Sequence, residues 1–218
     1  MNKVIRKLKS NKKAMTAVII VSFVIVLSVI VLLLIPNHLS IAKFKLYFGI
    51  ENHFDKYTDF NDYKNLSHYT GRVIDGKKTG QAYIVCYGDE AQKAFDHCVS
   101  DSGNYEIKKV ALAKSIGSFG VPVTDFYVFM FVFKNSSDAE EFYDHYSGYV
   151  MYGPIEHEEG KNFSYTVCYR KSDGCYLEND TVLILQGYGG RLFFDRMCKH
   201  WGIKSPYDPS LDKRAGSK

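Results

Sequence analysis

The chain has 218 residues, of which 46% are hydrophobic and 15% are aromatic, and it carries a formal net charge of +4. Six of its 28 basic residues lie within the first 13 positions, so the remainder holds 22 basic against 24 acidic residues. The folded part therefore lacks the positive face typical of nucleic-acid-binding domains, and no nucleic-acid partner is predicted.

Residues 14–36 are predicted to form a single transmembrane helix. Ala14 to Ile35 is a run of 22 residues without a charge. At a rise of about 1.5 Å per residue, it spans the roughly 30 Å of a bilayer's hydrocarbon core. Since basic flanks stay in the cytoplasm, the tail 1–13 is predicted to be cytoplasmic and the later residues to lie outside the cell membrane. A signal peptide cleaved near Ala42 is the alternative, although the run exceeds the roughly 7–15 residues of a signal-peptide core.

Residues 37–68 form an unusually aromatic segment. Within it, Ile41, Phe44 and Phe48 have the spacing of one helical face, and lysines lie between them. One interpretation is a juxtamembrane linker whose helix lies near the lipid headgroups. The other is that these rings pack beneath the domain that follows, and the sequence leaves both open.

Residues 69–203 are predicted to form one extracytoplasmic α+β domain, followed by a flexible tail over residues 204–218. Strands are predicted at 68–74, 80–87, 104–114, 125–134, 163–170 and 174–186. The segment 125–134 is apolar on both faces, which is typical of a central strand that is covered on each side. Ser172 to Gly174 supplies the turn of a hairpin.

Three strand–turn–helix units recur when the chain is aligned on Asp96, Asp144 and Asp195. The positions expected to face the core then coincide, with the i, i+3, i+4, i+7 spacing of one helical face. They are Ala91, Ala94, Phe95 and Cys98; Ala139, Phe142, Tyr143 and Tyr146; and Gly190, Phe193, Phe194 and Met197. The element order predicts a ferredoxin-like βαββαβ sandwich with its helices on one face of an antiparallel sheet, extended by a further strand and helix.

A glycine-rich turn, residues 187–190, precedes the third helix. Such turns cradle phosphate in P-loop proteins, but the lysine followed by serine or threonine of that motif is missing here. The equivalent turn of the first unit is followed by Asp89 and Glu90, whose charges suit a helix start and would repel phosphate. The second unit begins at Asn135, an ordinary N-cap residue. We interpret the glycines as a structural turn, with phosphate binding at Arg191 as a minor alternative.

The sequence contains weak candidates for chemistry. Cys168 and Cys175 bracket the predicted hairpin and are the candidate disulfide, unless a diagonal placement prevents the bond. His157 lies in the acidic stretch "IEHEEGK", expected to be a solvated loop, and His145 follows Asp144 on a predicted helix. Neither CxxC nor HExxH occurs, so no metal, cofactor or catalytic set is predicted.

The predicted function is a single-pass, membrane-anchored extracytoplasmic domain that binds another protein or a second copy of itself. A carbohydrate-binding or sensing module for the cell envelope is the alternative, suggested by 17 tyrosines and 15 phenylalanines. An exposed row of Tyr149, Tyr152 and Tyr188 would favour it. A hydrolase using His157 or His145 is a further alternative, and it requires a pocket in which one of them lies within about 3.2 Å of an acid or a cysteine.

Overall fold

A computed structural model of the chain describes residues 38–66, 73–74, 77–78, 80–99, 103–116, 126–148, 155–169, 171–187 and 190–207. The chain divides into two units, residues 1–37 and a compact unit that begins at His38. The first unit, with the predicted membrane span 14–36, lies outside the described residues. Within the described ranges, no helix combines the length and apolar content needed to cross a bilayer.

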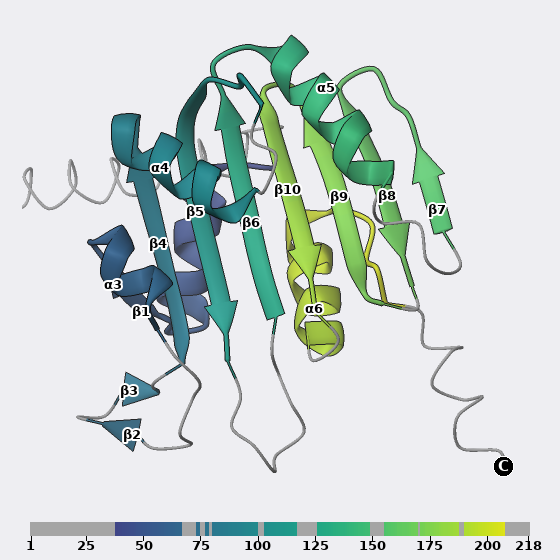
Figure 1. Cartoon of the computed structure of the whole chain (residues 1–218). Coiled ribbons are helices and arrows are strands. Elements are labelled where there is room, and N and C mark those ends of the chain that lie inside the picture. The colour runs from purple at the N-terminus through teal and green to yellow at the C-terminus, as the bar shows by residue number, and fades with distance from the viewer. Residues whose placement is uncertain are drawn as a thin grey trace, which may run out of the picture. The chain divides into compact units, whose positions relative to one another are not determined.

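An eight-stranded sheet forms the centre of the second unit, in the order β1-β4-β5-β6-β10-β9-β8-β7 (Figure 1). Its strands are β1 (Asp55–Tyr57), β4 (Gln81–Tyr87), β5 (Ile107–Ser115), β6 (Phe126–Phe133), β7 (Ile155–Glu158), β8 (Phe163–Cys168), β9 (Asp173–Glu178) and β10 (Thr181–Gln186). Neighbouring strands are antiparallel except β1, which runs parallel to β4. Two short strands, β2 (Val73–Ile74) and β3 (Lys77–Lys78), pair separately. The predicted mixed α+β class is confirmed.

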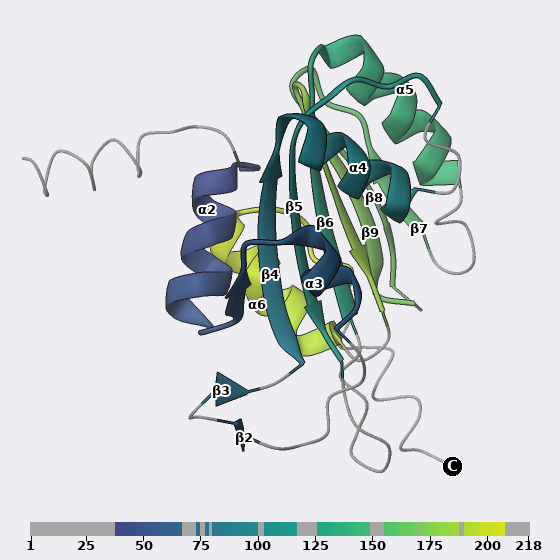
Figure 2. The ribbon, with the colours of Figure 1, turned by 60° about the vertical axis from the view of Figure 1, so that its left-hand side comes forward.

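Helices cover both faces of the sheet, as Figure 2 shows. On one face lie α2 (Ile41–Lys45), the π-helix η1 (Leu46–Glu51) and α6 (Arg191–Trp201); on the other lie α3 (Phe60–Lys64), α4 (Gly88–Cys98) and α5 (Ser136–Ser147). Successive strand residues point to opposite faces, so Met130 of β6 joins one core and Phe131 joins the other. The prediction that this strand is covered on each side is confirmed.

The strand order differs from the ferredoxin-like arrangement that the sequence predicted. Helix α4 connects β4 to β5, which are direct antiparallel neighbours, whereas a βαβ unit would bring back a parallel strand. In addition, α6 packs on the face opposite α4 and α5. The placement of α6 has a physical reason. Because β6 and β10 are buried on both sides, the sheet needs helices on each face.

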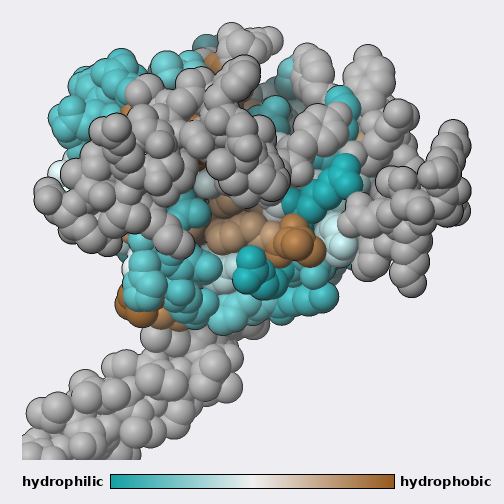
Figure 3. Space-filling model, turned by 90° about the horizontal axis from the view of Figure 1, so that it is seen from below, coloured by the Kyte–Doolittle hydropathy of each residue, from teal (hydrophilic) through white to brown (hydrophobic). Residues whose placement is uncertain are grey.

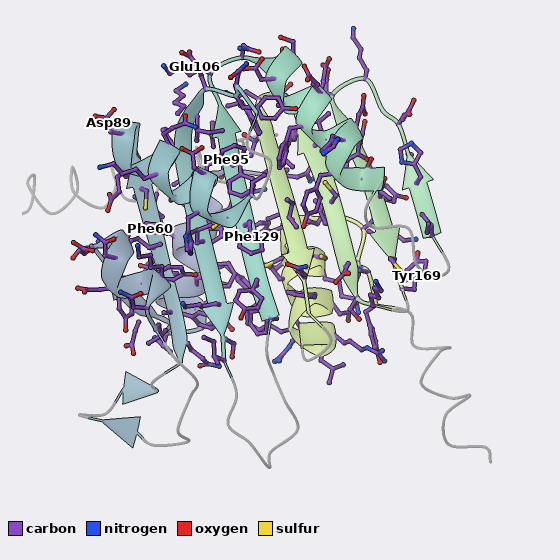
Figure 4. All side chains as sticks on the ribbon, in the orientation of Figure 1. Phe60, Asp89, Phe95, Glu106, Phe129 and Tyr169 are labelled. Atoms are coloured by element: carbon purple, nitrogen blue, oxygen red, sulfur yellow. The ribbon has the colours of Figure 1, made fainter. Side chains whose placement is uncertain are left out.

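The three predicted helices form, and most of their expected core positions are buried. Ala91, Ala94 and Phe95 are fully buried on α4, and Figure 4 shows Phe95 on the side of α4 that faces the sheet. The ring of Phe95 lies 4.9 Å from that of Phe131, edge to face. The predicted N-cap is confirmed, because Oδ1 of Asn135 accepts the backbone N–H of the third residue of α5 at 2.8 Å.

The aromatic segment that the sequence left between two interpretations is part of the folded unit. Phe44 and Phe48 are fully buried, and the ring of Phe44 lies 6.4 Å from that of Trp201 on α6. The Glu178 carboxylate accepts the backbone N–H of His38 and of the next residue at 3.0 and 2.6 Å. The rings therefore pack beneath the domain, and the folded unit begins well before the predicted boundary at residue 69.

The strands β7, β9 and β10 differ from what the sequence predicted. The stretch predicted as a solvated acidic loop forms β7. The single strand predicted over 174–186 is divided into β9 and β10 by a turn at Asn179, whose φ is 56°. Residues 204–207 of the predicted tail are described without helix or strand, and residues 208–218 lie outside the described ranges.

Apolar exposure alone does not single out a functional surface. The large exposed apolar residues lie on several different elements: Leu46, Ile50, Tyr87, Tyr127, Ile155 and Leu192. Figure 3 shows apolar residues near the centre of the face seen from below, with hydrophilic residues beside them.

Candidate functional site

A cavity of about 510 Å³ lies between α5 and the turns that join β7 to β8 and β9 to β10. It is lined by Ser136, Glu140, Tyr143, Asp144, Glu159, Gly160, Lys161, Asn162, Phe163, Ser164, Leu177, Asn179 and Asp180. The N-cap at Asn135 fixes where α5 begins, and the turn at Asn179 fixes the opposite wall. The volume falls within the roughly 300–1,000 Å³ typical of small-molecule sites.

The charge of the cavity is acidic. Glu140, Asp144, Glu159 and Asp180 contribute four carboxylates, against the single ammonium group of Lys161. Within the described ranges, Glu159 is hydrogen-bonded to His157, while the other three carboxylates form no ion pair. The cavity thus favours a cationic group over an anionic one.

A hydrogen-bonded chain of side chains connects two walls of the cavity. Nε2 of His157 lies 3.1 Å from Oε1 of Glu159, and Nδ1 lies 2.7 Å from Oγ1 of Thr166. The same Oγ1 lies 3.1 Å from the hydroxyl of Tyr143 on α5. One consistent set of donors runs from Tyr143 to Thr166 to His157 to Glu159. The chain fixes the edge strand to the helix.

Burial limits what this chain can do chemically. Thr166 and Tyr143 are 4% and 2% exposed, and burial raises the pKa of the Tyr143 phenol well above its ordinary value. A nucleophile needs access to substrate, and the residues that line the cavity include Tyr143 and Glu159 but neither His157 nor Thr166. His157 meets the distance criterion set for a hydrolase, but the hydroxyl beside it is enclosed.

The other face of β7 carries a second polar cluster. The Tyr165 hydroxyl lies 2.9 Å from Oε1 of Glu156 and 3.0 Å from Oε2 of Glu158, so one proton is shared between two carboxylates. Nζ of Lys204 lies 2.7 Å from the same Oε1 of Glu156, and the hydroxyl of Tyr169, labelled in Figure 4, donates to Oε2. The hydrogen bond from Lys204, followed by that from Tyr169, lowers the pKa of Glu156 to about 2.

The remaining weak candidates lie apart from this cavity. His145 lies on the exposed side of α5, and Arg191 is the first residue of α6, on the opposite face of the sheet. The structure therefore does not bring either one together with the Glu159–His157 pair. Tyr149, Tyr152 and Tyr188, which would test the carbohydrate alternative, lie outside the described residues.

Two glycines of the turn before α6 have structural roles in hydrogen bonding and packing. The backbone N–H of Gly187 donates to Oδ1 of Asp173 at 3.2 Å. A Cβ on Gly190 would lie 2.8 Å from Cβ of Phe126 and 2.8 Å from Cζ of Phe194. The turn is therefore glycine-rich for reasons of packing and hydrogen bonding, which supports the structural interpretation.

The predicted disulfide between Cys168 and Cys175 is not formed in the structure. Cys168 is paired across the hairpin with Asp173, and Cys175 is paired with Thr166, which places the two cysteines diagonally. Diagonal neighbours have Cα atoms about 7–8 Å apart, beyond the usual reach of a disulfide. Burial raises the pKa of Cys198, on α6, to about 12, so that thiol is not activated.

Neither the cavity beside α5 nor the burial of Lys114 was predicted from the sequence. Lys114 on β5 is 6% exposed, and its ammonium donates to the carbonyl oxygen of Tyr63 at 2.6 Å and to that of Leu66 at 3.4 Å. Burial lowers the pKa of Lys114, but its bonds to the end of α3 make it a structural anchor. Across the described ranges, no group of three or more His, Cys, Asp or Glu could hold a metal ion.

Comparison with known proteins adds no assignment. No family model matches the chain, and no curated protein matches it. A crystal structure of a GTP binding regulator from Thermotoga maritima shares 12% sequence identity and covers 59% of this chain and 84% of its own. The TM-score of 0.32 is too low for this likeness to carry a conclusion about fold or function.

Proposed function

We propose that this chain is a single-pass membrane protein whose extracytoplasmic domain binds a partner protein. The uncharged run from Ala14 to Ile35, preceded by six basic residues, supports the anchor and its orientation. The folded unit begins at His38, directly after that run.

The observation that carries the binding proposal is the open edge of the sheet at β7. Among the described strands, β7 ends the sheet order and is paired on one side only, with β8. Ile155, at its start, is 42% exposed. An edge strand presents a row of backbone donors and acceptors, and many binding domains recruit an extended peptide there as an added strand.

Protease protection tests the anchor and its orientation. Protease added to intact cells is expected to degrade residues 43–218 while residues 1–13 remain intact behind the membrane. The measurement uses antibodies against tags at each end, with a cytosolic protein as the control for leakage. A domain that survives until the cells are lysed would contradict the proposed topology.

Crosslinking in intact cells tests the binding role. A photoreactive amino acid placed at Ile155 is expected to capture a specific protein, whereas the same amino acid at Lys93, on α4, is not. Captured species are identified by mass spectrometry. If capture at Ile155 yields glycan alone, the envelope-ligand function is supported in place of protein binding.

A hydrolase is the second candidate, favoured by the 3.1 Å contact between Nε2 of His157 and Glu159 beside the cavity. The test is hydrolysis of a panel of chromogenic esters and peptides by the purified protein. A hydrolase using His157 would lose activity on the change His157→Ala and keep it on the change His145→Ala.

A further inference from the structure

The edge strand β7 and the cavity next to its end both carry acidic side chains. Glu156 and Glu158 lie on the strand, and Glu159 follows it directly. The cavity adds the carboxylates of Glu140, Asp144 and Asp180. The strand and the cavity together hold six carboxylates and two lysines, Lys161 at the cavity and Lys204 bonded to Glu156.

Strand alternation places charge on both sides of the open edge. His157 points to the α5 face, where it contacts Thr166, while Glu156 and Glu158 point to the other face, where both contact Tyr165. Because β7 is antiparallel to β8 with His157 opposite Thr166, the register of the edge is fixed. A strand added to β7 would have its side chains beside these carboxylates on one face and beside His157 on the other, next to Glu159, which lines the cavity.

A second copy of this chain is a poor occupant of the edge. Pairing β7 with β7 would bring Glu156 and Glu158 of one copy beside the same residues of the other, and like charges on adjacent strands are destabilising. Charged residues on a short edge strand are a common means by which proteins prevent such self-association. Charge complementarity instead favours a partner strand that carries cations.

We propose that β7 receives an extended lysine- or arginine-rich segment of a partner protein as an added antiparallel or parallel strand, with one cationic side chain entering the acidic cavity. This inference rests on the proposed partner-binding function and names the surface and the chemistry of the partner. Backbone hydrogen bonds along β7 supply the docking, and the carboxylates of the cavity select the sequence.

The affinity of a basic peptide for the full-length protein in nanodiscs made from an uncharged lipid tests this proposal. The probe is a fluorescent seven-residue peptide of alternating lysine and threonine, followed by fluorescence anisotropy. Two comparison peptides replace every lysine by glutamate or methylate alternate backbone nitrogens. Only the unmodified basic peptide is expected to bind, and its affinity is expected to fall as salt is added.

Two neighbouring residues of α5 provide a matched pair of variants. Glu140 lines the cavity, whereas Glu141 lies 3.4 Å from the hydroxyl of Tyr105, away from it. Both side chains are exposed, so both variants are expected to fold. Glu140→Lys is expected to weaken binding about tenfold or more, and Glu141→Lys by less than about threefold. Equal effects of the two would overturn a role for the cavity.

The residues to which a crosslinking peptide attaches distinguish strand addition at β7 from protein binding elsewhere on the domain. A benzophenone at the centre of the peptide is expected to attach to residues 155–159. Attachment elsewhere, binding of the methylated peptide or absence of binding would each overturn the strand-addition proposal. The proposed function would survive such a result if crosslinking in cells still captured a specific protein, and it would fail if none were captured.

Discussion

At the scale of single residues, Glu156 shows how an edge strand is held in place. It accepts hydrogen bonds from Lys204, Tyr169 and Tyr165, and these lower its pKa from 4.5 to about 2. A carboxylate whose pKa is lower in the folded state stabilises the fold above its unfolded pKa, and this stability is lost as the pH falls toward the folded pKa. The Glu156 side chain is 39% exposed, so solvent screening reduces the contribution below what the full shift implies.

The pH dependence of unfolding tests this role of Glu156. We expect the free energy of unfolding of the wild type to exceed that of Glu156→Gln at pH 6, and the difference to shrink between about pH 5 and pH 2. Urea unfolding at a series of pH values measures it. In a Lys204→Met background, the change Glu156→Gln is expected to have a much smaller effect on the free energy of unfolding at pH 6. A difference that stays constant down to pH 2 would show that the ionised carboxylate has no stabilising role.

Phe142 is the residue on which one of the two cores depends most clearly. It is 1% exposed, and its ring lies within 5.3–5.8 Å of the rings of Phe95, Phe131 and Phe133. Phe142→Ala is expected to reduce the free energy of unfolding by about 3–5 kcal/mol, because it leaves a cavity that the sheet cannot close. Leu192→Ala, at a side chain that is 63% exposed, is the control and should change stability by less than about 0.5 kcal/mol. Thermal denaturation of both variants measures the contrast.

At the scale of elements, helices with strong periodicity were predictable and short edge strands were not. The positions of α4, α5 and α6 follow from apolar residues that recur at helical spacing, and their buried residues agree with that pattern. The strand β7 was not predicted because its residues alternate between a histidine and two glutamates and lack an apolar face. Their hydrogen bonds to the neighbouring strand β8 are visible only in the structure. The strand order was not predicted correctly, because the sequence shows which faces of a strand are apolar but not which strands become neighbours.

The candidate site was predictable only in part, for the same reason. His157 and its acidic neighbours are visible in the sequence as a cluster of polar residues. Tyr143 and Thr166 are not, because a tyrosine and a threonine within apolar stretches look like ordinary core residues. The fold brings them to His157 across strand and helix, over separations of 14 and 9 residues in the chain. Such contacts depend on the sheet order, which the sequence pattern did not supply.

The turn before α6 gives a test of why an element needs glycine. Gly190 has an ordinary backbone conformation, with φ at −88°, so the constraint is the 2.8 Å approach of Phe126 and Phe194 to its missing Cβ. Gly190→Ala is expected to cost about 1–3 kcal/mol of unfolding free energy through overpacking. Gly148→Ala, where nothing lies within 4 Å of the added carbon, should be neutral or slightly stabilising. Equal effects in chemical denaturation would remove packing as the reason for Gly190.

At the scale of the whole molecule, the segment 38–66 is part of the fold, because it supplies the edge strand β1 and helices on both faces of the sheet. The buried rings of Phe44 and Phe48 pack with α6 over one face. The Glu178 carboxylate fixes the start of the segment, and Lys114 fixes its end through the carbonyl groups of α3. Both charged groups are buried, so removal of the segment would leave them without these partners as well as exposing apolar surface.

Two shortened chains test whether this segment belongs to the fold. A chain of residues 38–218 is expected to unfold in one cooperative transition and to show a near-ultraviolet circular dichroism spectrum of ordered aromatic side chains. A chain of residues 69–218, which starts at the boundary that the sequence predicted, is expected to lack that spectrum and to bind hydrophobic dyes, because one face of β4, β5 and β6 is uncovered. If residues 69–218 instead give the same spectrum and the same urea midpoint, the segment 38–66 would be a linker that merely rests on a finished domain.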